Sequence, residues 1–167
     1  MEKITRYSII FIALMLLQIL IFNNIPAIGM ISPYLYLAFI LMLPVNMSET
    51  VVLLLGFFTG FMVDISINSL GVHASATVMM AAVRPTVLRI LAPRIGYESN
   101  NIPILSTFGL AWVLKYIIPC VAIHHVTLYL CFTFTFEDLG FLFFRMLINI
   151  VLTVFVIVLS EYFVFKR

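Results

Sequence analysis

The stretch that decides the fold runs from Glu49 to Arg94 and reads ETVVLLLGFFTGFMVDISINSLGVHASATVMMAAVRPTVLRILAPR. It contains two apolar segments, 50–67 and 70–91, joined by the polar pair Asn68 and Ser69. Apolar segments of roughly 20 residues are long enough for helices that cross the ~30 Å hydrocarbon core of a bilayer. The stretch therefore predicts two membrane-spanning helices joined by a short turn.

The rest of the chain has the same character. Of its 167 residues, 64% are hydrophobic and only 10% are charged, with a mean hydropathy of +1.22. Soluble domains carry about 25% charged residues, so this chain has too few to cover a surface that faces water. We predict one all-α membrane domain over residues 1–167, with six spans at about 7–22, 34–46, 50–67, 70–91, 104–132 and 141–163.

The basic residues predict the orientation of these spans. If the N-terminus is cytoplasmic, most lysines and arginines fall at cytoplasmic ends and none in an outer loop, as the positive-inside rule requires. These residues are Lys3, Arg6, Arg84, Arg89, Arg94, Lys166 and Arg167. We therefore expect both termini in the cytoplasm. The basic residues lie at segment ends and form no continuous face, so no nucleic-acid partner is expected.

The first candidate site is a face of small residues that ends in a carboxylate. Gly56, Gly60 and Asp64 lie four residues apart and share one side of a helix. Small residues let helices approach closely in lipid, and Gly71 begins a similar face on the next helix. Asp64 is therefore expected in a helix–helix contact, because a carboxylate that faces hydrocarbon is unfavourable. It could fix the turn by hydrogen bonds, bind a ligand or relay protons, or contact a partner protein.

The second candidate site is a polar cluster expected near the outer face. Its members are Asp64, His73, His124, His125 and Arg145. We expect Arg145 to pair with Asp64, or with Glu137 and Asp138 in the outer loop, because a guanidinium at that depth needs a partner. Adjacent histidines on a helix point about 100° apart, whereas a chelating pair has i, i+4 spacing. No metal site and no cofactor are expected.

The third candidate site is a basic patch at the cytoplasmic end of the fourth predicted span. Arg84, Arg89 and Arg94 follow one another at five-residue intervals, close to Pro85 and Pro93. Such a patch is typical of an anchor to anionic lipid, and it could also be a docking surface for a cytoplasmic partner. HExxH, Gly-x-Ser-x-Gly, P-loop and Gly-x-Gly-x-x-Gly motifs are all missing, so no enzyme is predicted.

The run GFFTGFMVDISINSLGVHA, residues 56–74, resembles the rod shape-determining protein family MreD. That family has a Gly-x-x-x-Gly that leads to an Asp, then a Leu-Gly followed by a small residue. The matching positions are Gly56, Gly60, Asp64, Leu70, Gly71 and Ala74. The resemblance implies a non-enzymatic scaffold of the bacterial inner membrane that binds MreC. With the MreB filament, RodA and a penicillin-binding transpeptidase, it would coordinate lateral peptidoglycan synthesis and cell shape.

A second resemblance leads to a different function. The chain is also similar to the substrate-binding S components of energy-coupling-factor vitamin transporters, which have six helices and an outward-facing pocket. Those proteins tend to carry Ala-x-x-x-Ala in the first helix, whereas this chain has Ala13 followed by Leu17. The scaffold is the favoured interpretation, and an enzyme without familiar motifs is a third. A homodimer, and lipid or a lipid-linked precursor in an outer pocket, are left open.

Overall fold

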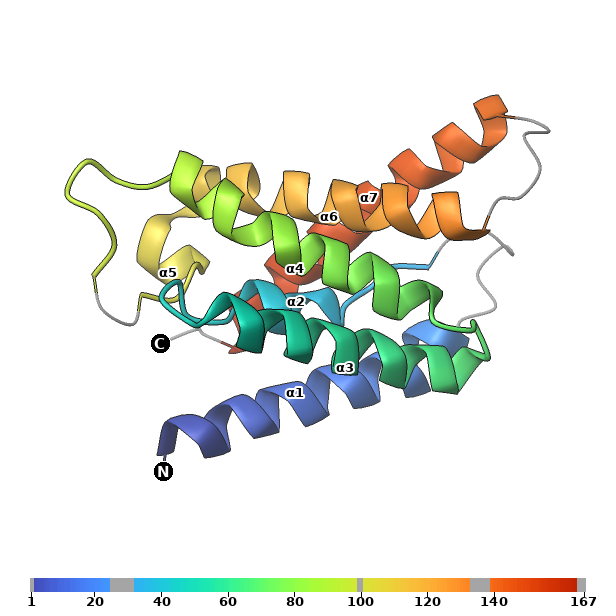
Figure 1. Ribbon diagram of the computed structural model, residues 1–167, viewed down its shortest axis with the longest axis horizontal. Coiled ribbons are helices and arrows are strands. Elements are labelled where there is room, and N and C mark those ends of the chain that lie inside the picture. The colour runs from blue at the N-terminus through green and yellow to red at the C-terminus, as the bar shows by residue number, and fades with distance from the viewer. Residues whose placement is uncertain (1, 25–31, 99–100, 133–138, 165–167) are drawn as a thin grey trace.

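The computed structural model describes residues 2–24, 32–98, 101–132 and 139–164. Over these ranges every regular element is a helix, which confirms the predicted all-α fold (Figure 1). The elements are α1 (Glu2–Leu20), the 3-10 turn η1 (Phe22–Asn24), α2 (Leu37–Leu41), α3 (Glu49–Ile67), α4 (Val72–Ile90), α5 (Leu105–Phe108), α6 (Leu110–Phe132) and α7 (Leu139–Val164).

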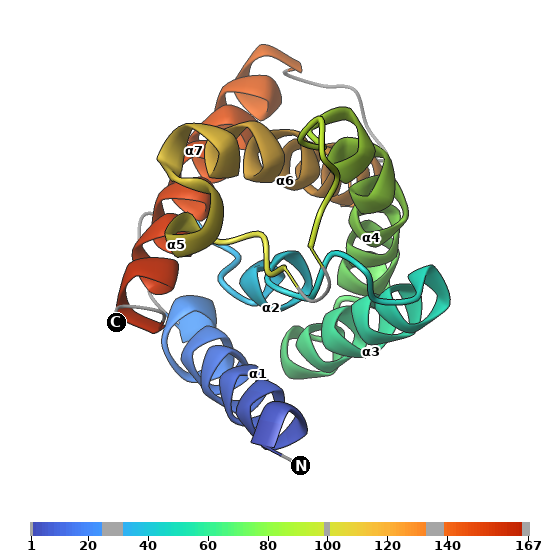
Figure 2. The same cartoon turned by 90° about the vertical axis from the view of Figure 1, so that its left-hand side faces the viewer.

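The long helices enclose a short one. Seen end-on, α1, α3, α4, α6 and α7 surround α2, which lies in the middle of the bundle (Figure 2). The start of α1 and the end of α7 lie at one end of the long axis, called here the terminal end (Figure 1). The turn between α3 and α4, residues 68–71, lies at the opposite end, called here the far end.

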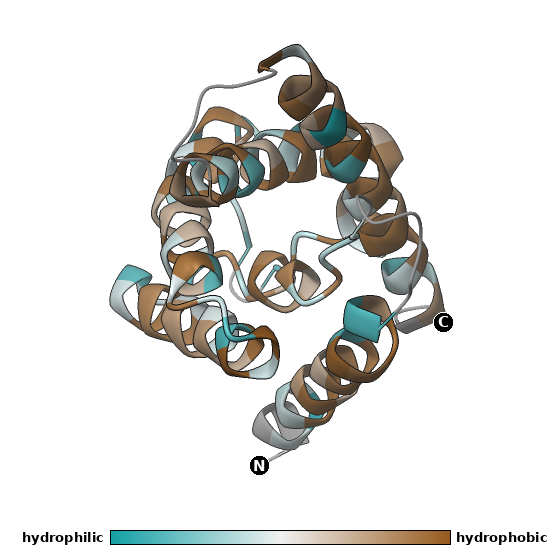
Figure 3. Cartoon of the chain, turned by 90° about the vertical axis from the view of Figure 1, so that its right-hand side faces the viewer, coloured by the Kyte–Doolittle hydropathy of each residue, from teal (hydrophilic) through white to brown (hydrophobic). Residues whose placement is uncertain are grey.

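Four of the described helices are long and apolar enough to cross a membrane. They cover Thr5–Asn24, Glu49–Ile67, Leu110–Phe132 and Leu139–Phe163. Apolar residues, brown in Figure 3, predominate along these helices. The helix α4 has the same length as α3 but carries two arginines and a histidine, and it packs between α3 and α6. Its polar side chains His73, Thr77 and Arg84 are buried in those contacts.

The segment predicted as a helical span over 34–46 differs from that expectation. Only Leu37–Leu41 is helical, and five residues at ~1.5 Å each are far too short to cross a bilayer. Pro33 and Pro44 flank this helix, and proline restricts the helical conformation of the residue before it. Every residue from Leu35 to Leu43 is nevertheless buried, with 0–6% exposed. We call residues 32–45 the central segment, and its buried part, residues 35–43, lies in the core of the bundle.

The predicted helix over 104–132 is interrupted near its start. It consists of α5 and α6, which are separated by Gly109 with φ +76°. Glycine adopts this left-handed conformation without the steric penalty of a Cβ atom, so the chain changes direction there. The remaining predicted boundaries agree with α3, α4 and α7 to within about two residues, because their apolar runs end at clear polar turns.

Candidate functional site

The contact between α3 and α4 is built on the two glycines of the small face. A Cβ atom at Gly60 would lie 2.5 Å from the carbonyl oxygen of His73 and 2.6 Å from Cα of Ala74. At Gly56 it would lie 3.2 Å from Cβ of Ala81. The backbones of α3 and α4 thus approach so closely at Gly60 that no other residue fits without a shift. This close approach places the end of α3 directly against the start of α4.

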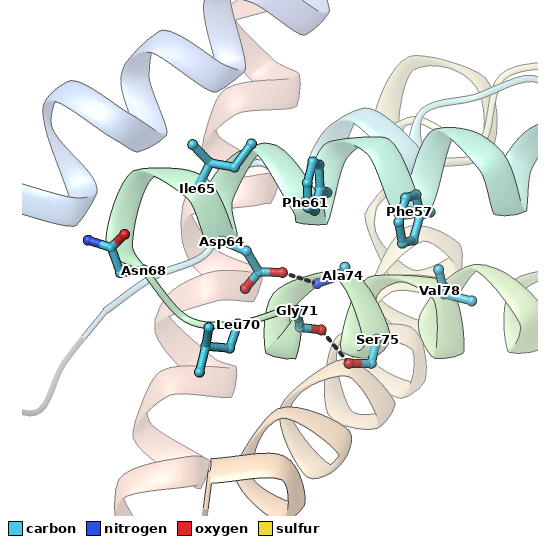
Figure 4. Close-up of a pocket in the computed structure, with 10 residues that line it drawn as sticks. All are labelled: Phe57, Phe61, Asp64, Ile65, Asn68, Leu70, Gly71, Ala74, Ser75 and Val78. Atoms are coloured by element: carbon cyan, nitrogen blue, oxygen red, sulfur yellow. Dashed lines mark hydrogen bonds between the residues drawn. The ribbon is translucent and has the colours of Figure 1, made fainter.

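Asp64 uses that proximity to cap α4. Its carboxylate is 3% exposed and accepts hydrogen bonds from the N–H groups of His73, at 2.9 Å, and Ala74, at 2.8 Å. Figure 4 shows the bond to Ala74. It also accepts one from the hydroxyl of Ser69. The first N–H groups of a helix have no partner within the helix, and a negative charge there is favourable. Of the roles open to Asp64, fixing the turn is the one these bonds support.

The expected pairing of Asp64 with Arg145 is not needed to satisfy the carboxylate. Both oxygens of Asp64 already accept hydrogen bonds from the turn and from α4. Arg145 lies on α7, close enough to Tyr34 to act on it electrostatically. The other partners expected for Arg145, Glu137 and Asp138, lie outside the described residues. Arg145 therefore belongs to the surroundings of Tyr34.

The turn between α3 and α4 has an unusual backbone. Asn68, Leu70 and Gly71 all have positive φ angles, of 57°, 53° and 90°. For leucine this conformation is uncommon, whereas glycine adopts it freely. Leu70 is 99% exposed, so its side chain projects from the far end. The requirement for Gly71 is conformational, because a Cβ atom there would meet nothing within 4 Å.

A groove follows the outer side of this hairpin. Its volume is about 710 Å³, and Phe57 and Phe61 form one wall with their rings stacked 5.7 Å apart (Figure 4). The opposite wall is α4, which presents small residues there. The full lining is Phe57, Phe61, Asp64, Ile65, Asn68, Leu70, Gly71, Ala74, Ser75 and Val78. The groove is thus mainly apolar, with Asp64, Asn68 and Ser75 as its polar members.

The predicted outer cluster exists in part, and it is organised around two tyrosines that the sequence analysis did not select. The hydroxyl of Tyr36 lies 2.8 Å from Nε2 of His124 and 3.1 Å from Nδ1 of His73. The ring of Tyr34 lies 5.2–5.6 Å from those of His73, His124 and His125. The structure therefore brings the three histidines together, and Asp64 joins them through the N–H group of His73.

Side chains of α1 and α7 bind the first half of the central segment. Gln18 accepts hydrogen bonds from the N–H groups of Leu35, at 2.7 Å, and Tyr36, at 3.3 Å. On α7, Asn149 accepts one from Ser32 at 2.8 Å, and Thr153 accepts one from Tyr34 at 3.1 Å. Unpaired backbone groups are unfavourable in a membrane, so non-helical backbone is tolerated only where protein satisfies it. These side chains provide that satisfaction.

Arg84 binds the second half of the central segment. This contact corrects the expectation that Arg84 belongs to a basic patch at the cytoplasmic end. It is 1% exposed, and it donates hydrogen bonds to the carbonyl groups of Leu43 and Pro44 and to the hydroxyl of Tyr116. Tyr116 in turn donates to the carbonyl of Leu41 at 3.0 Å. Arg84 thus binds carbonyl groups that lie just beyond the end of α2. Of the predicted patch, only Arg89 and Arg94 are exposed.

Several residues of this interior were missed from the sequence. Each is a polar side chain inside an otherwise apolar helix or segment, and that isolation was the available signal. They are Gln18, Tyr34, Tyr36, Thr77, Tyr116, Asn149, Thr153 and Glu161. Glu161 accepts a hydrogen bond from the N–H group of Leu105 at 2.9 Å, which ties α7 to the start of α5. Within the described ranges, no three histidine, cysteine, aspartate or glutamate side chains are grouped as a metal ion requires.

Fold and site together define a class of protein. Four apolar helices of spanning length, around an interior whose buried polar side chains bond mainly to one another and to the backbone, indicate an α-helical membrane protein. No protein-family model matches the chain, and comparison with curated proteins and with solved structures gave no match. The assignment within this class therefore depends on the residues themselves.

Proposed function

We propose that this protein is a non-enzymatic scaffold of the bacterial inner membrane, similar to MreD, which binds MreC and helps to coordinate lateral peptidoglycan synthesis with RodA and a transpeptidase. The MreB filament would be an indirect partner. The resemblance over residues 56–74 supports this proposal, and the structure gives those residues a physical role. Gly60 permits the close approach of α3 and α4, and Asp64 locks their turn.

The proposal includes six passes through the membrane, with both termini in the cytoplasm. The four apolar helices account for four of these passes. The helix α4 provides a fifth, since it runs beside α3 and has the same length. The central segment provides the sixth, because its first residues bind α7 and its last residues bind Arg84 near the end of α4. The exposed Arg89 and Arg94 would then face the cytoplasm, as the positive-inside rule favours.

One observation favours a scaffold over a transporter component. Asp64, the carboxylate that could have bound a ligand, is instead used by the fold. Both oxygens of Asp64 accept hydrogen bonds from the α3–α4 turn and the start of α4, and Arg84 donates to two carbonyls and a hydroxyl. A vitamin-binding S component needs polar side chains that remain free for its substrate. An interior used in this way favours a protein that acts through its surface.

The groove beside the α3–α4 turn is the proposed contact surface for the transmembrane part of MreC. Its small residues Gly71, Ala74 and Ser75 would let a partner helix approach α4 closely. Phe57 and Phe61 would then pack against that helix from the side of α3. The contact would lie at the far end of the bundle, on the outer side of the membrane in the proposed orientation.

The test is affinity purification from native membranes in mild detergent, followed by identification of the recovered proteins. Ser75→Phe fills the groove without entering the α3–α4 contact, since Ser75 is exposed. Ala82→Phe is the matched control, because Ala82 is exposed on the same helix but does not line the groove. We expect MreC with the wild-type protein and with Ala82→Phe, and little with Ser75→Phe. An ATPase-coupling subunit or a retained vitamin would establish the transporter instead.

A further inference from the structure

A buried chain of two imidazoles and a phenol joins three elements of the far half. Tyr36 comes from the central segment, His73 from α4 and His124 from α6. The Tyr36 hydroxyl lies within hydrogen-bond distance of both rings, and all three side chains are at most 1% exposed. The hydroxyl of Thr77 lies 3.3 Å from that of Tyr36, but its one proton goes to the closer carbonyl of His73 at 2.6 Å. These three side chains are thus shielded from water.

A count of donors and acceptors shows that one nitrogen in this group of three side chains lacks a hydrogen-bond partner. The Tyr36 hydroxyl has a single proton, so it donates to one imidazole and accepts from the other. Whichever direction is taken, Nδ1 of His124 has no hydrogen-bond partner in the described part of the chain. It is either an N–H group without an acceptor or a lone pair without a donor. His125, its neighbour, differs because its Nδ1 lies 2.8 Å from the carbonyl of Val121.

Within the described residues, the groups around His124 offer no acceptor for a second N–H group on its ring. The titratable and charged groups that face these three side chains are Tyr34, Asp64 and His125, and Tyr129 and Arg145 lie beyond them, near Tyr34. Asp64 is the only acid among them, and its oxygens already accept three hydrogen bonds from other groups. Arg145 adds a positive charge near Tyr34. An imidazolium at His124 would therefore be buried with an N–H group that lacks an acceptor, which is strongly unfavourable.

We propose that Tyr36, His73 and His124 form a proton-binding site that opens the far half of the bundle when it is occupied. While the imidazoles are neutral, the site holds the central segment against α4 and α6. When a proton is added, water must reach Nδ1 of His124, and the contacts of Tyr36 separate to admit it. The open state binds one proton more than the closed state, so opening increases as pH falls.

This inference goes beyond the scaffold role and does not depend on it. Acidification would alter the face that the far end presents, whatever partner binds there. In the proposed orientation that end lies on the outer side of the membrane, so the site would respond to external pH. The purified protein in lipid nanodiscs is accessible from both sides, and the test therefore needs no assumption about orientation.

The first experiment uses nitrogen-15 NMR of the intact protein with labelled histidine, from pH 8 to pH 5. The chain has only three histidines, so every imidazole signal comes from this region. We expect neutral tautomers at pH 8 and the appearance of imidazolium, together with faster amide exchange over residues 35–43, as pH falls. The opening constant should rise up to about tenfold for each pH unit below ~6.5, the ordinary pKa of histidine.

Two outcomes of this experiment would overturn the proposal. One is that all three histidines stay neutral down to pH 5. The other is that imidazolium forms while amide exchange, corrected for its intrinsic pH dependence, stays unchanged. The second experiment compares His124→Phe with His125→Phe, a matched change at the adjacent residue. The pH response of exchange should disappear in the first variant and persist in the second, and equal responses in both would contradict the assignment to His124.

Discussion

At the scale of single residues, Gly60 and Asp64 determine how α3 and α4 meet. Gly60 contributes the absence of a Cβ atom, which lets the backbones touch, and Asp64 contributes an acceptor for N–H groups that α4 cannot satisfy itself. The two roles depend on each other. If α4 moved away from Gly60, the N–H groups of His73 and Ala74 would lose the carboxylate.

The glycine contact predicts a graded loss of stability. Gly60→Ala should lower the free energy of unfolding by about 1–3 kcal/mol, because its Cβ atom would overlap backbone atoms that cannot rotate away. Gly56→Ala should have a smaller effect, since its Cβ atom would meet the Ala81 side chain at 3.2 Å. Unfolding by denaturing detergent, followed by circular dichroism, measures both.

Gly140→Ala in α7 is the matched control for this series. A Cβ atom there would meet nothing within 4 Å, and alanine favours a helix over glycine by up to about 1 kcal/mol. Its stability should equal or slightly exceed that of the wild type. Equal stability of Gly60→Ala and Gly140→Ala would show that the close approach at Gly60 is not required.

At the scale of elements, sequence reasoning succeeded where structure is local. The apolar runs of α3, α4 and α7 end at polar turns, and the glycine–aspartate face follows from four-residue spacing. The central segment could not be found in this way. Its N–H groups bind Gln18, 17 positions from Leu35, and Asn149, 117 positions from Ser32. Its composition is as apolar as that of a membrane-spanning helix, because its side chains are buried among the other helices.

The same limit applies to the candidate site. The three histidines were selected because each is polar in an apolar helix, and the structure brings their rings close together. Tyr36, which joins two of them, lies in the segment whose path could not be predicted. Arg84 was placed in the basic patch since its spacing to Arg89 and Arg94 is regular, and nothing local indicates that carbonyl groups 40 and 41 positions away require it.

Arg84 gives a prediction for this element. Arg84→Met should remove the side-chain donor from the carbonyls of Leu43 and Pro44, of which Pro44 keeps only the N–H group of Met47, and should destabilise the protein by about 1–3 kcal/mol. Hydrogen exchange over residues 35–43 should become faster, because the end of α2 loses its anchor. Arg89→Met is the matched control, since Arg89 is exposed and donates to Thr86 in its own helix. Equal exchange in both variants would contradict an anchoring role for Arg84.

At the scale of the whole molecule, the two ends differ in chemistry. The far end carries the Asp64-capped turn and the histidine cluster, whereas the terminal end carries the exposed arginines. Each end also has one fully exposed apolar side chain, Leu70 at the far end and Ile95 after α4. This pair provides a direct measurement of the proposed orientation.

Cysteine labelling in intact cells should distinguish the two positions. A membrane-impermeant thiol reagent should label Leu70→Cys from outside and Ile95→Cys only after the membrane is permeabilised. The unsubstituted chain is the control, since Cys120 is buried and Cys131 is half-buried. Labelling of both positions from the same side would exclude the proposed arrangement of α4.

The bonds between α7 and the central segment also constrain how the chain is made. Ribosomes deliver residues 32–45 long before Asn149 and Thr153, the side chains that later accept hydrogen bonds from Ser32 and Tyr34. Until α7 has been synthesised, those backbone groups have no partner inside the protein, and lipid offers none. The insertion machinery must therefore keep an early segment in a hydrated or shielded place while most of the polypeptide is translated. The helix α7 thus completes the burial of a segment that was made much earlier, so the two halves must meet before this part of the fold can form.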